Sequence, residues 1–233
     1  MTDTLAPRAV TGSSAPPGPN RSWTFSTSLV MLARPQGEEA ESIRTLRTNV
    51  VTQLIEQGRR ATTICGPGPG VGCTFVAANL SVSLSQIGLK TLLIDANMRR
   101  PGLDALFRSP HEASGLAECL LTDDGNHLAH AEADVLPNLS VMFAGKAVSD
   151  PQTLLAKDRF RNLMDSCMRD FDVTIIDTPP ANSCADARLV SSVIGYSIVV
   201  ARAGRTFVQD LKVLIQELES DNARVIGTVL NQA

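Results

Sequence analysis

ICGPGPGVGCTF, residues 64–75, is the stretch that decides the fold of this 233-residue chain. It ends a short apolar run, places four glycines within seven residues, and leads into the helical apolar spacing of residues 76–88. A strand, a glycine-rich loop and a helix in this order are typical of a nucleotide-binding P-loop. Glycines let backbone N–H groups approach phosphate oxygens, and the helix dipole adds to the attraction. The residues expected to form this anion cradle are Gly68, Gly70, Val71, Gly72, Cys73, Thr74 and Phe75, with the Thr74 hydroxyl offered to Mg²⁺.

Two positions of this loop depart from the G-x-x-x-x-G-K-[ST] pattern. Pro67 takes the place of the first glycine, and Cys73 takes the place of the lysine that reaches the β and γ phosphates. A glycine-rich turn without a ligand is the alternative interpretation. Because a helix N-terminus lowers the pKa of a thiol, a redox-sensitive Cys73 is a further hypothesis. The features that follow favour a modified P-loop.

Two apolar runs downstream of the loop each end in an aspartate. Residues 90–95 read KTLLID and residues 172–177 read DVTIID, so both predict buried parallel strands. Ligands of open α/β sheets bind at the carboxyl ends of strands, which places Asp95 where Mg²⁺ and phosphate would lie. Asp177 is expected to hold a metal-bound water or to orient Thr74. A simple turn or helix cap is the alternative role for Asp95.

Strands are predicted to start near residues 61, 90, 139, 172, 196 and 225, with helices between most of them. Predicted helices cover residues 38–57 and 76–88, a short stretch at 115–121, and a longer one that opens at Asp150-Pro151 and extends to Cys167. Another follows a Thr206 and Gln209 capping box, with a buried stripe of Phe207, Leu211, Leu214 and Leu218. The pattern predicts an α/β fold with a doubly wound, mainly parallel sheet of about six or more strands.

Composition sets the class of protein. Hydrophobic residues make up 43% of the chain, enough for one α/β core, which we place at residues 37–233 after a disordered Pro/Ser-rich leader at 1–36. A net charge of −3 argues against a nucleic-acid partner. Five scattered cysteines suit a cytoplasmic protein with reduced thiols, and neither a membrane span nor a signal peptide is expected.

A stripe of charges lies on the first predicted helix. Glu41, Arg44 and Arg47 follow one another at three-residue steps, so neighbouring side chains are close on the helix surface. Spacing alone favours a solvated stripe that pairs with itself.

With these residues assembled, residues 38–233 resemble the bacterial tyrosine kinase (BY-kinase) family, within the class that includes the MinD and ParA ATPases. The resemblance is carried by ExxRxxRTN at 41–49, the modified loop up to AANL at 77–80, and LLIDANMRRP at 92–101. Weaker support comes from GL at 115–116, LL at 154–155, IDTPP at 176–180 and VLN at 229–231.

The resemblance implies roles for individual residues. The helix with Glu41, Arg44 and Arg47 would pack one subunit on the next in a homo-oligomeric ring. ATP and Mg²⁺ would be the cofactors, with Mg²⁺ held by Thr74 and Asp95. The catalytic set would be Asp95, Asn97 and the Walker B acid Asp177, and Asn231 would lie near the base.

Three departures from the family bear on activity. Cys73 replaces the phosphate-contacting lysine, Asn97 replaces the second aspartate of a D-x-D motif, and the chain lacks a tyrosine-rich tail, since Tyr196 is its only tyrosine. A charged hydrogen bond is worth roughly 1.5–3 kcal/mol, so the loss of the lysine alone would weaken nucleotide binding tenfold or more. Arg99 or Arg100 would be the candidates for partial compensation.

The function implied is that of a cytoplasmic protein at the inner membrane, bound there through a membrane polysaccharide co-polymerase. It would support exopolysaccharide or capsule biosynthesis and export, with tyrosine kinase activity weakened or lost. Two alternatives remain open. One is an active tyrosine kinase or ATPase with a substitute basic residue. The other is a MinD/ParA-type positioning ATPase.

Overall fold

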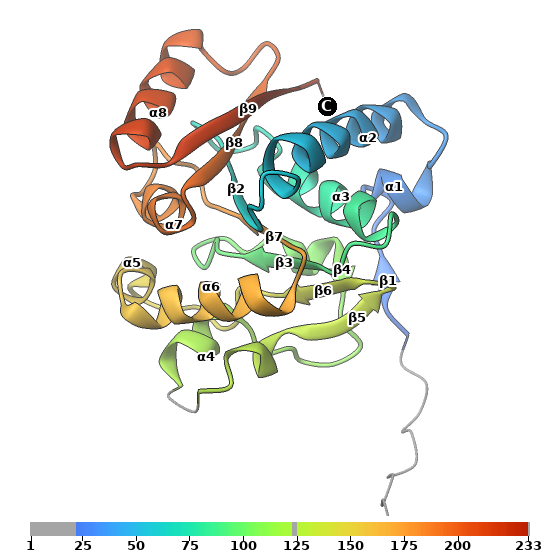
Figure 1. Ribbon diagram of the computed structural model, residues 1–233, viewed down its shortest axis with the longest axis vertical. Helices are drawn as coiled ribbons and strands as arrows, with labels where there is room; N and C mark the ends of the chain where they lie inside the picture. The colour runs from blue at the N-terminus through green and yellow to red at the C-terminus, as the bar shows by residue number, and fades with distance from the viewer. Residues whose placement is uncertain (1–21, 123–124, 233) are drawn as a thin grey trace, which may run out of the picture.

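The computed structural model describes residues 22–122 and 125–232, which build a seven-stranded sheet with helices on both faces (Figure 1). The strand order is β5-β6-β3-β7-β2-β8-β9, and every neighbouring pair is parallel except β5 and β6. The strands are β5 (Glu132–Leu136), β6 (Leu139–Met142), β3 (Thr91–Asp95), β7 (Val173–Asp177), β2 (Ala61–Cys65), β8 (Tyr196–Arg202) and β9 (Arg224–Asn231). The predicted doubly wound, mainly parallel sheet is confirmed.

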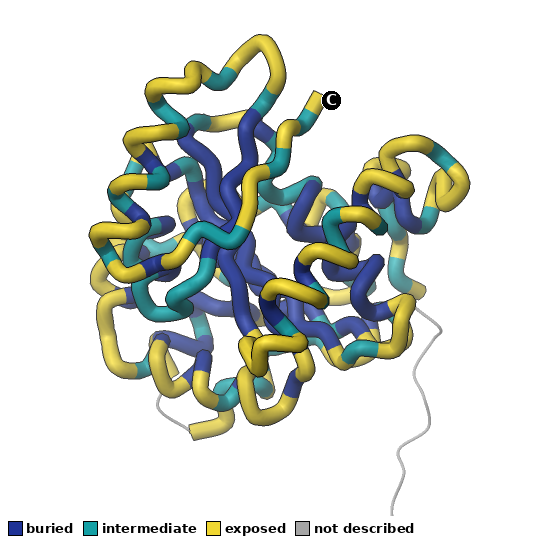
Figure 2. The backbone as a smooth tube through the Cα atoms, turned by 45° about the horizontal axis from the view of Figure 1, so that its top comes forward, coloured by how far each residue is buried: buried dark blue, intermediate teal, exposed yellow. Residues whose placement is uncertain are grey.

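The three central strands carry the candidate site. Every residue of β2, β3 and β7 is buried, as expected for apolar strands covered on both faces (Figure 2). Asp95 and Asp177 are register partners on neighbouring parallel strands. The loop that follows β2 therefore leaves the sheet beside the two strand-end aspartates.

The sheet divides the core into two layers, each covered by helices. On one face α2 (Glu38–Val50) continues into a π-helical turn at Val51–Ile55 and packs with α3 (Cys73–Ser85). The other face is covered mainly by α4 (Leu116–Leu121), α5 (Pro151–Leu155), α6 (Asp158–Asp170), α7 (Asp186–Ile194) and α8 (Val208–Ser220). Successive residues of β3 point to opposite layers, Leu93 to the first and Leu92 to the second. Among the described residues, no helix is long and apolar enough to cross a bilayer.

Two helix predictions need correction. The single helix expected from Asp150 is two helices, because the backbone at Lys157 is extended and α6 starts anew at Asp158. The Thr206 capping box is absent: the Thr206 hydroxyl accepts a hydrogen bond from the Arg202 N–H instead, and α8 starts at Val208. Phe207, expected in the buried stripe, is 75% exposed.

The N-terminal segment is ordered earlier than the expected boundary at residue 37. β1 (Thr24–Phe25) pairs with β4 (Phe107–Arg108), and α1 (Val30–Ala33) buries Val30 and Met31. The Asn79 side chain fixes this segment, since its Oδ1 accepts from the Met31 N–H and its Nδ2 donates to the Ser28 carbonyl. The part of the predicted leader at 1–21 lies outside the described residues.

Candidate nucleotide-binding site

The glycine-rich loop has the close backbone packing that a phosphate cradle requires. Gly72 has φ +101°, and a Cβ placed there would lie 2.2 Å from Asn231 Nδ2. A Cβ on Gly66 would lie 2.5 Å from Val71 Cγ2 and 2.8 Å from the Val200 carbonyl oxygen. Asn231 closes the arrangement by donating from Nδ2 to the Val71 carbonyl at 3.0 Å. The loop thus needs glycine at both positions.

The loop borders a cavity of about 250 Å³ at the carboxyl ends of the central strands. Its walls contain most of the predicted cradle and residues that follow β3 and β7: Gly68, Pro69, Gly70, Val71, Gly72, Cys73, Thr74, Asn97, Arg100, Thr178 and Pro180. Phe75 and Asn231 instead line a neighbouring cavity of about 330 Å³ that also touches α2. The structure therefore brings the predicted loop residues, Asn97 and Asn231 to two adjoining hollows.

Two buried carboxyls lie at the strand ends beside the loop, on the neighbouring strands β3 and β7. Asp95 borders a separate cavity of about 490 Å³ that Phe107 and His111 also line. Thr74 Oγ1 donates to Asp177 Oδ2 at 2.6 Å, as expected for an acid that orients this hydroxyl. Asp177 Oδ1 is buried and has no hydrogen-bond partner among the described residues. Asp95 Oδ1 accepts from the Asn97 N–H at 2.9 Å, and its Oδ2 accepts from Gly102 N–H at 3.0 Å. Neither aspartate side chain reaches solvent.

Burial makes this pair of acids costly to ionise. It raises the pKa of Asp95 to about 6, although backbone N–H donors such as that of Gly102 oppose the shift. Burial and the charge of Asp95 raise the pKa of Asp177 well above its usual range. A divalent cation would relieve both effects, so the residues present fit Mg²⁺. Because no three His, Cys, Asp or Glu side chains converge in the described chain, water and nucleotide phosphate would complete the coordination.

The pKa of the Cys73 thiol is shifted in the direction opposite to that of a redox-sensitive thiol. Burial, followed by the charges of Asp177 and Cys65, raises its pKa well above the usual range. These effects outweigh a helix N-terminus, so the thiol is protonated and uncharged at neutral pH. It supplies neither a cation for phosphate nor a thiolate.

The two arginines after β3 have different environments. Arg99 forms a bidentate ion pair with the fully buried Asp186, at 2.8 Å and 3.1 Å. Arg100 lines the loop cavity, and its backbone N–H donates to Asn97 Oδ1 at 3.1 Å. Asn97 therefore shapes this turn. Sequence reasoning missed Asp186, because a lone aspartate at the start of α7 carries no signal of its distant partner.

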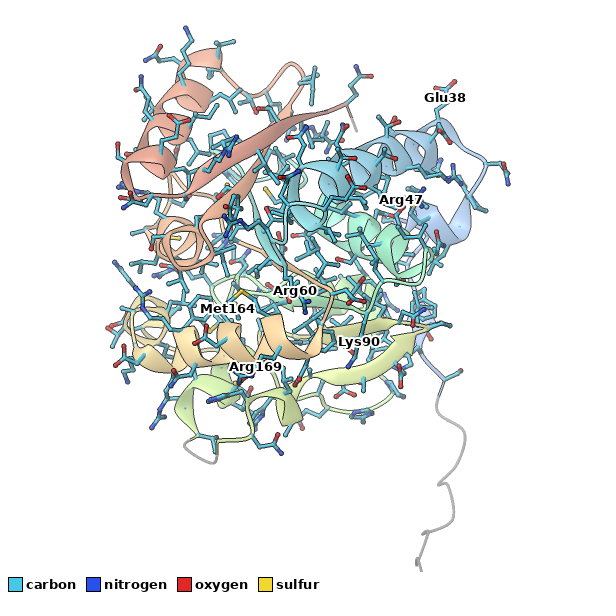
Figure 3. The ribbon with its side chains drawn as sticks, viewed as in Figure 1. Glu38, Arg47, Arg60, Lys90, Met164 and Arg169 are labelled. Carbon is cyan, nitrogen blue, oxygen red and sulfur yellow. The ribbon has the colours of Figure 1, made fainter. Side chains whose placement is uncertain are left out.

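The charged stripe on α2 pairs within the chain. Glu41 Oε2 accepts from Arg44 Nη1 at 2.8 Å, and Arg44 also donates to the Pro35 carbonyl. Arg47 Nη1 donates to Ser83 Oγ on α3 at 3.2 Å. Figure 3 labels Arg47 on α2, while Glu38 at the start of that helix points outward. Within one subunit Glu41 and Arg44 pair with each other, as spacing alone favoured, whereas Arg47 binds Ser83 on α3 instead.

Together, a glycine-rich cradle, a threonine hydroxyl and two strand-end aspartates define a P-loop NTPase-type domain. A family model described as an AAA domain matches residues 63–223. The solved kinase domain of Escherichia coli tyrosine kinase ETK superposes with a TM-score of 0.82, at 30% identity, over 88% of this chain and 80% of that chain. The chain belongs to the bacterial tyrosine kinase family.

Two curated relatives show how much of a known protein this chain covers. Tyrosine-protein kinase ptk of Acinetobacter johnsonii is 34% identical over 191 residues, covering 82% of this chain and 26% of that protein. The putative tyrosine-protein kinase CapB of Staphylococcus aureus is 28% identical over 199 residues, 85% of this chain and 86% of that protein. This chain therefore spans about a quarter of the length of ptk and most of that of CapB.

An Asp177→Asn variant is expected to be more stable than the wild type without Mg²⁺. The raised pKa of Asp177 means that ionisation penalises the folded state as pH rises above 3.8, the ordinary value, so the penalty is larger near pH 8 than near pH 5. We expect a gain of about 1 kcal/mol or more in the free energy of unfolding by urea near pH 8, and a smaller gain near pH 5. The exposed Asp165→Asn on α6 is the control. A less stable Asp177→Asn near pH 8 contradicts the prediction.

Proposed function

We propose that this protein is a nucleotide-responsive BY-kinase relative whose phosphoryl transfer is weakened or lost, acting in exopolysaccharide or capsule biosynthesis and export. One observation carries the proposal. The cradle and its two acids are built as for a nucleotide with Mg²⁺, yet the lysine position holds the protonated thiol of Cys73. Binding needs the backbone donors that remain, whereas transfer needs charge aimed at the developing transition state.

The other residues of the site also support nucleotide binding with weakened transfer. Asn97 is an amide where the family has a second acid, and its Oδ1 is already engaged by the Arg100 N–H. An amide cannot serve as a base or neutralise a metal, which weakens catalysis further. Thr74, Asp95 and Asp177 keep the residue types needed to hold Mg²⁺. Asn231 borders the hollow next to the loop, the position proposed for the base.

The partner proposed is the cytoplasmic end of a membrane polysaccharide co-polymerase, which would keep the protein peripheral to the inner membrane. A homo-oligomer is proposed through α2, where the Glu41–Arg44 pair would exchange an intrachain contact for one between subunits. Glu41 is exposed and Arg44 is half-buried, so exchanging their ion pair costs little, although Arg44 would also give up its hydrogen bond to the Pro35 carbonyl. ExxRxxR on an accessible helix and the family membership support this part of the proposal.

The test is a calorimetric titration with ADP and Mg²⁺, followed by a [γ-³²P]ATP transfer assay on the same preparation. We expect measurable ADP binding with transfer to protein tyrosine near background. Robust transfer by the wild type would remove the loss of catalysis from the proposal and favour the active-kinase alternative. Co-sedimentation with the cognate co-polymerase tests the partner separately, and failure to bind it would refute the docking role.

A further inference from the structure

The loop that lost its lysine is surrounded by arginine side chains. Arg100 lines the cavity on the side of β3, and Arg202 Nη1 donates to the Gly70 carbonyl at 2.9 Å. Arg205 Nη1 lies 3.7 Å from where a Cβ on Gly70 would be, so its guanidinium is next to the loop. Arg100 lies in the connection from β3 to η2 (Leu103–Ala105), Arg202 is the last residue of β8, and Arg205 lies in the connection from β8 to α8. Strands β3 and β8 lie on opposite sides of β2 in the sheet order.

The same three arginines lack acidic partners. In the parts of the chain that the structure describes, no carboxylate lies within 4 Å of Arg100, Arg202 or Arg205. Arg99, the neighbour of Arg100, is neutralised by the buried Asp186. The three arginines closest to the loop are thus available to an anion, whereas Arg99 is already paired.

The local backbone geometry explains why Arg100, and not Arg99, faces the loop cavity. The Arg100 N–H donates to both the Asn97 carbonyl, at 3.2 Å, and Asn97 Oδ1, at 3.1 Å, which closes a tight turn. Successive side chains of the turn then diverge, Arg99 to Asp186 on α7 and Arg100 to the wall of the loop cavity. On the other flank, Arg202 holds the loop through Gly70, and Arg205 stands beside the same glycine, exposed.

We propose that Arg100 and Arg205 together supply the phosphate-binding charge that Cys73 cannot, with Arg202 as a positioning residue for the loop. A guanidinium stays charged at all physiological pH values and offers a planar fork of donors that fits phosphate oxygens. The inference rests on the proposed nucleotide binding and names the residues responsible for it. In this chain two guanidinium groups would bind the phosphates in place of the single ammonium group of the usual lysine.

The test compares two double variants that remove the same charge. Arg100→Ala/Arg205→Ala is expected to weaken ADP binding by at least about tenfold in calorimetric titration. The control, Arg161→Ala/Arg224→Ala, changes exposed arginines on α6 and at the start of β9 and is expected to retain wild-type affinity. Equal affinity of the two double variants would overturn the inference. Melting temperatures without ligand establish that both are folded.

A lysine at position 73 gives a second, independent readout. If the arginines stand in for the lysine, Cys73→Lys should raise ADP affinity at least about threefold more in the Arg100→Ala/Arg205→Ala background than in the wild type. The same gain in both backgrounds would show independent action and overturn the inference. Wild-type protein that binds no ADP would also overturn it, whereas co-sedimentation with the co-polymerase would still decide the docking role.

Discussion

Gly72→Ala is expected to abolish nucleotide binding, with affinity for ADP reduced about a hundredfold or more. Gly72 has φ +101°, which costs a residue with a Cβ roughly 1–3 kcal/mol, and the new Cβ would lie 2.2 Å from Asn231 Nδ2. Either the loop or Asn231 must then move, and the hydrogen bond from Asn231 to the Val71 carbonyl is lost with that movement. Calorimetric titration with ADP and Mg²⁺ measures the effect.

The matched control for this variant is a glycine outside the loop. Gly88 has φ +88° and a Cβ there would meet no atom within 4 Å, so Gly88→Ala carries similar backbone strain away from the cradle and is expected to bind ADP within about threefold of the wild type. Equal affinities for the two alanine variants would contradict the cradle geometry. Circular dichroism of both variants checks that any loss reflects the loop and not global unfolding.

Cys73→Lys is expected to bind ADP about ten- to a hundredfold more tightly than the wild type, because a charged hydrogen bond is worth roughly 1.5–3 kcal/mol. The gain in phosphoryl transfer should be larger, since charge placed at the developing oxyanion acts most strongly in the transition state. The added ammonium would also lie beside Asp177, whose ionised form it would stabilise. Titration and [γ-³²P]ATP transfer measure the two effects.

A side chain of similar length without charge separates electrostatics from bulk. Cys73→Met is expected to bind ADP no more tightly than the wild type, since methionine is unbranched and reaches as far as the lysine stem. A gain shared by the methionine and lysine variants would refute the explanation by charge. Tighter ADP binding by Cys73→Lys without any rise in transfer would assign the proposed loss of catalysis mainly to Asn97.

The central sheet was predictable because its signals are local. The strands ending at Asp95 and Asp177 are short apolar runs, which only a sheet covered on both faces explains. Strand β5 was missed because it is an antiparallel edge strand with a register irregularity and mostly unburied residues. The break before α6 was also missed, since Ala156 and Lys157 are both acceptable inside a helix.

The candidate site was predictable only in part, for a different reason. Thr74 and Asp177 each belong to a recognisable sequence motif, so their hydrogen bond could be predicted. Arg202 reaches Gly70 across 132 positions, and this contact exists only because β8 lies beside β2. The hypothesis of a lowered pKa for Cys73 is wrong because the helix position of this thiol is visible in the sequence, whereas its burial beside Asp177 is not.

Helix α3 contacts three separate parts of the molecule along its length. Its first turn closes the phosphate loop, Asn79 in its middle grips the N-terminal segment at Ser28 and Met31, and Ser83 near its end receives Arg47 from α2. A packed helix moves as a unit, so a small tilt at the loop end would shift both attachments together. We therefore expect nucleotide binding at the loop to be coupled to the position of α2.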